Sequence, residues 1–143
     1  MSDAVTPQGQ EPVTEQPAEP GTGVPRRLVV KTTSGVDRPE AANQALTVAA
    51  AAVAAGAQVS LWLTGESAWF AIPGRADDLS LEHAAPASDL LAAVLAAGTV
   101  TLCTQCAARR EITADDVLPG VRIAGAAAFA EEVLQPGAQA LVY

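Results

Sequence analysis

The chain has 143 residues, of which half are hydrophobic, and it carries a formal net charge of −8. This length suits one folded domain with a substantial apolar core and is short for two. The 16 acidic residues against 8 basic ones argue against nucleic acid as a partner, because binding to the phosphate backbone requires clustered Lys and Arg.

The first 25 residues differ in composition from the rest of the chain. They are rich in proline, glutamine and acidic residues and contain few large apolar side chains. Such a segment cannot bury enough surface to offset the entropy lost on ordering. We therefore predict a disordered, acidic, proline-rich tail over 1–25 and one folded domain over 26–143. No signal peptide pattern is present, and the longest apolar stretch (48–57) is too short to cross a bilayer, so we expect a cytoplasmic protein that does not contact a membrane.

Strands and helices alternate along the folded part. Short β-branched or alternating runs predict strands at 28–32, 58–63, 99–102, 121–124 and 138–142. Alanine-rich periodic runs predict helices at 39–55, 88–97 and 126–134, with a single helical turn at 68–72. Alternation with short connections is typical of a mostly parallel sheet covered by helices on both faces.

Capping residues are expected at several helix starts. Asp37 has the residue type and position of a cap for the first long helix, and Ser88 for the second. Thr113 and Asp116 form a capping-box pattern that is expected to open another short helix. Residues 75–86 show no clean period, and we predict a surface loop there.

The strongest chemical signal is the Cys103-Thr104-Gln105-Cys106 segment, which contains both cysteines of the chain. It lies where a predicted strand passes into a predicted helix, at the carboxyl end of the strand, where reactive groups gather in parallel sheets. Free amide groups at a helix start favour a thiolate over a thiol, and Arg109 and Arg110 follow at helical spacing to add positive charge. In a reducing cytosol, such a pair is more often catalytic or metal-binding than structural.

Several of these segments in this order resemble the DsrE/DsrF-like family. The resemblance covers 28–143 and is carried by a strand ending in Thr33-Ser34-Gly35, the strand and turn at 59–65, a helix ended by Gly98, and the run from Cys103 to Arg109. It implies a five-stranded, three-layer α/β/α sandwich that assembles as a homo-oligomer, a trimer or a hexamer. Several members accept a persulfide sulfur on a cysteine and pass it on.

By this resemblance Cys103 is the leading sulfur acceptor, and Cys106 matches the family more loosely. Cys106 is the candidate resolving partner, because one thiol of a pair can displace the sulfur from a persulfide on the other. Arg109 and Arg110 are supporting candidates, together with Ser34 and Gly35, which follow a strand and are candidates to line the same cleft. The function that this implies is a sulfur-relay or persulfide-carrier protein, with a protein sulfur donor and a protein acceptor as partners and with no cofactor.

Three other hypotheses stay open at this point. A thiol–disulfide oxidoreductase also uses Cys-x-x-Cys between a strand and a helix, although no thioredoxin-type Trp-Cys precedes this pair. Two thiolates form half of a zinc site, and with His83 as the only histidine such a site would have to be shared between subunits. If both thiols are inert, the chain is a non-catalytic assembly module, so the residues alone leave open whether this is an enzyme.

Overall fold

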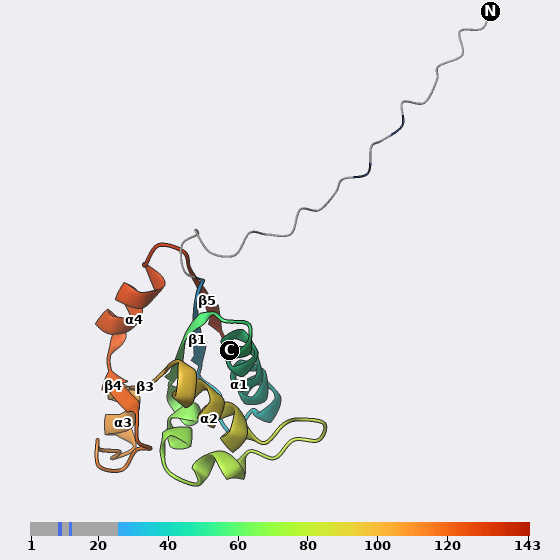
Figure 1. The fold of residues 1–143 in the computed structure, drawn as a ribbon. Coiled ribbons are helices and arrows are strands. Elements are labelled where there is room, and N and C mark those ends of the chain that lie inside the picture. The colour runs from blue at the N-terminus through green and yellow to red at the C-terminus, as the bar shows by residue number, and fades with distance from the viewer. Residues whose placement is uncertain (1–8, 10–11, 13–25) are drawn as a thin grey trace, which may run out of the picture.

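The computed structural model describes residues 9, 12 and 26–143 of the chain (Figure 1). The tail predicted over 1–25 therefore lies, except for Gly9 and Pro12, outside the described residues. The elements in chain order are β1 (Arg27–Thr32), α1 (Pro39–Ala54), β2 (Gln58–Leu63), the 3₁₀ helices η1 (Gly65–Ala71) and η2 (Arg75–Asp78), α2 (Ala87–Ala97), β3 (Thr99–Cys103), α3 (Thr104–Arg109), β4 (Val121–Ala124), α4 (Ala126–Val133) and β5 (Ala138–Val142).

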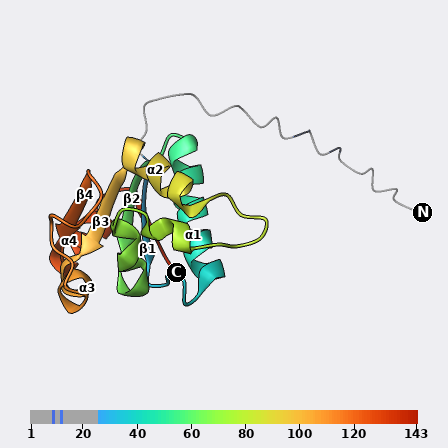
Figure 2. The same cartoon turned by 90° about the horizontal axis from the view of Figure 1, so that it is seen from below.

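The five strands form one parallel sheet in the order β4-β3-β2-β1-β5. Helices α1 and α2 pack on one face of this sheet, and α4 lies over the other face (Figures 1 and 2). This arrangement confirms the predicted α/β/α sandwich, and every strand pair in it is parallel. Because all carboxyl ends of the strands point the same way, the residues that follow β1, β2 and β3 meet at one edge of the sheet.

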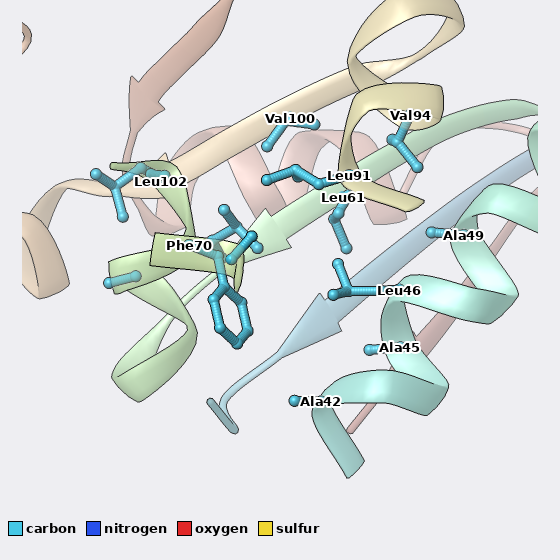
Figure 3. Packing of buried hydrophobic residues seen from close by; sticks show 14 of the residues in the cluster. Ala42, Ala45, Leu46, Ala49, Leu61, Phe70, Leu91, Val94, Val100 and Leu102 are labelled. Atoms are coloured by element: carbon cyan, nitrogen blue, oxygen red, sulfur yellow. The ribbon is translucent and has the colours of Figure 1, made fainter. Parts of the chain in front are cut away.

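The main core fills the space between the sheet and the helices α1 and α2 (Figure 3). Alternate strand positions such as Val30, Leu61 and Leu102 point into it and are fully buried, as period-two strand geometry requires. The facing side of α1 is mostly alanine, and these short side chains allow the helix to lie close to the sheet. The buried positions of α1 are Ala42, Ala45, Leu46 and Ala49.

The layer on the opposite face is thinner, because none of the residues of α4 is fully buried. Trp62, which is 2% exposed, meets Phe129 of α4 edge to face, with 5.3 Å between the ring centroids. Glu132 of α4 accepts hydrogen bonds from Ser60 Oγ (2.6 Å) and Trp62 Nε1 (2.8 Å), and it pairs with Arg122 of β4. Burial alone would raise the pKa of the Glu132 carboxyl, but these three donors outweigh it and hold the pKa below its ordinary value. The contact between the Trp62 and Phe129 rings and the polar contacts of the Glu132 carboxylate thus attach α4 to the sheet.

Two of the predicted helix caps are wrong. The residue at the cap position of α1 is Arg38, because the Asp37 carboxylate accepts the backbone N–H of Gly35 at 2.8 Å instead. Helix α2 begins one residue before Ser88, with Pro86 at its cap position and no side-chain cap. In both cases the fixed backbone angle of a nearby proline is enough to start the helix.

Two connecting segments also differ from expectation. The loop predicted at 75–86 begins with the 3₁₀ helix η2. The capping pattern at Thr113 and Asp116 closes a turn and opens no helix: the Asp116 carboxylate accepts both the N–H and the hydroxyl of Thr113. The side-chain contacts expected of a capping aspartate are therefore made, but the chain bends away after them.

Candidate functional site

Cys103 is the last residue of β3 and occupies the cap position of α3. Because Leu102 points into the main core, the strand pleat turns Cys103 toward the face that carries α4. There it lines a cavity of about 320 Å³ together with Cys106, and the walls include Trp62 and Phe129. Cys103 is partly exposed, in contrast to Cys106.

Cys106 lies three residues further along, in the first turn of α3, and is buried, with 8% of its surface exposed. Its sulfur accepts the backbone N–H of Gly65 at 3.2 Å. Gly65 has a φ of +53°, and a Cβ atom at this position would lie 2.6 Å from the Thr33 carbonyl oxygen. The turn after β2 therefore needs glycine both for its conformation and for the close approach that brings this amide to the sulfur.

The pKa of the Cys103 thiol is lowered from its ordinary value. Burial acts in the opposite direction, but the amides of Cys106 and Gln105, the Cys106 thiol and the charge of Lys31 together outweigh it. Cys103 makes no capping hydrogen bond of good geometry, so the amides act on it at longer range than a full bond. A lowered pKa increases the thiolate fraction of Cys103 at neutral pH, and the thiolate is the nucleophilic form of cysteine.

Lys31 is the cation that the structure brings to this cavity, and the residue pattern alone does not single it out. It lies on β1 beside Trp62 in the parallel register, and its Nζ atom is 5.1 Å from the centroid of the Phe129 ring. Lys31 and Cys103 both line the cavity, although 72 positions separate them in the sequence. The only available signal was a lysine near the carboxyl end of an otherwise apolar strand.

Replacement of Lys31 with methionine is expected to raise the pKa of Cys103, because the positive charge that favours the thiolate is lost while the side-chain length is kept. The measurement is the rate at which iodoacetamide alkylates Cys103, as a function of pH. In the methionine variant this rate should begin to rise at a higher pH than in the unchanged protein, and the rate at neutral pH should be lower. Lys31→Arg keeps the charge and should leave the profile in place. Identical profiles for the methionine and arginine variants would show that Lys31 has no electrostatic effect on the sulfur.

The two arginines predicted beside the cysteines have other surroundings. Arg110 donates to Glu66 of η1 at 2.7 Å and to the Cys106 carbonyl oxygen at 3.2 Å, so it ties α3 to η1. Arg109 is exposed on the surface of α3. The ion pair of Arg110 supports the loop that holds Cys106, which is a structural contribution to the site.

Ser34 and Gly35 were expected to line the same cleft as the cysteines. Both are buried, and a Cβ atom on Gly35 would lie 2.7 Å from the backbone oxygen of Glu66, so the two loops pack tightly there. From the loop that follows β1, the cavity wall includes Thr33; from the turn that follows β2, it includes Thr64 and Gly65. Ser34 and Gly35 themselves are not among the residues that line the cavity, so their expected place in the cleft is wrong: both are buried where the two loops pack.

Among residues 9, 12 and 26–143, no group of three or more His, Cys, Asp or Glu side chains is placed to hold a metal ion. Over the same residues, no helix is both long and apolar enough to span a bilayer.

Comparison with known proteins places the chain. A family model described as the DsrE/DsrF-like family matches residues 26–143. This chain belongs to the DsrE/DsrF-like family. Its fold is similar to that in the crystal structure of the ychN protein from E. coli, with a TM-score of 0.68 and 18% sequence identity over 84% of this chain and 100% of the ychN chain. At this identity the likeness shows the DsrE-like fold alone. No curated protein sequence matches the chain.

Proposed function

We propose that this DsrE/DsrF-like protein is a sulfur carrier that accepts sulfane sulfur on Cys103 and passes it to a protein acceptor. The observation that carries the proposal is the position of Cys103: a partly exposed sulfur with a lowered pKa, in a cavity at the carboxyl edge of the sheet. The Cys103 thiolate attacks the outer sulfur of a donor persulfide. A Cys103 persulfide forms, and the donor leaves as its thiolate.

The cavity suits a carrier because it combines access with protection. Aromatic and alanine side chains of β2 and α4 form part of its wall, and Lys31 supplies one positive charge beside the sulfur. A persulfide is an anion at neutral pH, so a nearby cation favours it for the reason that it favours the thiolate. The site thus stabilises both the Cys103 thiolate, which attacks the donor, and the Cys103 persulfide that forms.

The Cys106→Ser protein tests this function, because it leaves Cys103 as the only cysteine. After incubation with glutathione persulfide and alkylation, mass spectrometry should find one additional sulfur atom on Cys103. The matched Cys103→Ser protein should take up none, since its remaining thiol is buried. A Cys103 that stays a free thiol in excess persulfide, or sulfur uptake at Cys106 in the Cys103→Ser protein, would overturn the proposal.

A further inference from the structure

The cavity holds two sulfur atoms, and a carrier needs only one. Cys103 and Cys106 occupy the cap position and the third residue of α3, a spacing that brings both side chains to one face of the helix. Both line the same cavity, yet their surroundings differ: Cys103 is partly exposed, whereas Cys106 is buried and receives the Gly65 amide. This difference in exposure is typical of a pair in which one thiol attacks and the second thiol resolves the product.

We propose that Cys106 resolves the Cys103 persulfide, so that the protein releases sulfide when no acceptor is bound. This inference rests on the proposed function, because it begins from a sulfur atom already loaded on Cys103. It adds an activity, the reduction of sulfane sulfur to sulfide, to that of the carrier.

The step balances without another reagent. The Cys106 sulfur attacks the inner sulfur of the Cys103 persulfide, the Cys103–Cys106 disulfide bond forms, and the bond to the outer sulfur breaks. The outer sulfur leaves as hydrosulfide and carries the proton that Cys106 loses. In this step the outer sulfur is reduced from oxidation state minus one to minus two and the Cys106 sulfur is oxidised from minus two to minus one, while the Cys103 sulfur stays at minus one. A dithiol reductant afterwards returns the protein to its starting state.

Three features of the described residues support this reaction. The two sulfurs are close to one another, because both line the cavity and the Cys106 thiol is among the hydrogen-bond donors to the Cys103 sulfur. The Gly65 N–H donates to the Cys106 sulfur at 3.2 Å, which fixes the position of this sulfur in the wall of the cavity. Burial keeps Cys106 away from external persulfides, so it acts on the sulfur that Cys103 brings in.

The experiment follows the fate of one sulfur atom. Reduced full-length protein is loaded with a small molar excess of glutathione persulfide, desalted at once, and assayed for released sulfide and for intact mass. The unchanged protein should release about one equivalent of sulfide and end as the intramolecular disulfide. The Cys106→Ser protein should keep the extra sulfur on Cys103 and release none, and Cys106→Ala should do the same, with circular dichroism confirming that both variants are folded.

The results separate this inference from the proposed function. If the unchanged protein holds a stable persulfide as long as Cys106→Ser does, Cys106 is not a resolving thiol, and the carrier function stands. Sulfide release at equal rates from both proteins would also overturn the inference, because the sulfur would then leave by an intermolecular route. If neither protein takes up sulfur on Cys103, it is the carrier function that fails.

Discussion

Replacing Gly65 with alanine is expected to destabilise the protein by about 2–5 kcal/mol. A non-glycine residue in the left-handed region costs about 1–2 kcal/mol, and forcing an atom into a filled space adds about 1–3 kcal/mol. Both apply here, because Gly65 has a φ of +53° and its Cβ would lie 2.6 Å from the carbonyl oxygen of Thr33. Urea denaturation followed by circular dichroism measures the change in the free energy of unfolding.

Gly74 supplies a matched control for this substitution. It also has a positive φ, of +80°, but a Cβ atom there would meet nothing within 4 Å. Gly74→Ala should therefore show only the conformational cost, about 1–2 kcal/mol. Equal destabilisation by the two substitutions would mean that the loop at Gly65 relaxes freely, and the close packing around Cys106 would then have no energetic importance.

Truncation of Trp62 to alanine is expected to cost about 3–5 kcal/mol, the range for removal of a large buried aromatic side chain. Trp62 is 2% exposed and joins the sheet to α4 through two contacts, the Phe129 ring and the Glu132 carboxylate. Because α4 has no fully buried residue, these contacts, together with those of Ser60 and Arg122 to Glu132 and of Lys31 to Phe129, hold it against the sheet. Urea denaturation gives the loss of stability, and limited proteolysis should cut the segment around α4 more readily than in the unchanged protein.

The Trp62→Phe variant separates the two contacts. Phenylalanine keeps an aromatic ring against Phe129 but loses the N–H that binds Glu132, so the expected loss is about 1.5–3 kcal/mol, the range for a hydrogen bond to a charged group. The proteolysis pattern should stay close to that of the unchanged protein. If alanine and phenylalanine prove equally harmful, the hydrogen bond, and not the ring contact, holds α4 in place.

Strand positions were predictable because the signal for them is local. The runs at 58–63, 121–124 and 138–142 were predicted with the bounds that the structure has, since apolar or β-branched residues flanked by glycine and proline mark them. Helix starts were less predictable. Asp37 has the correct residue type for a cap, but whether it caps the helix or binds the preceding loop depends on how that loop turns.

The site was predicted in part for a similar reason. A Cys-x-x-Cys pair at the end of a strand can be found by inspection, but the order in which strands associate cannot. Lys31 reaches the cavity because β1 lies beside β2 and β2 beside β3. Arg110 stands at the expected helical spacing from Cys106 but faces Glu66, a residue of η1 whose position also depends on tertiary packing. Self-assembly as a homo-oligomer and the existence of a protein sulfur donor and a protein acceptor stay predictions.

The pairing of β1 with β5 has a consequence for how the molecule is made. The Thr33 hydroxyl donates to the carbonyl oxygen of Tyr143 across 110 positions, so the earliest of the five strands in the sequence pairs with the latest of the five. Closing so long a loop slows folding, and the five-stranded sheet cannot be completed before β5 has been synthesised. During synthesis one edge of β1 stays without its partner, and such an edge can pair with a neighbouring nascent chain. Slower growth at low temperature, or a chaperone that covers this edge, should therefore raise the yield of correctly folded protein.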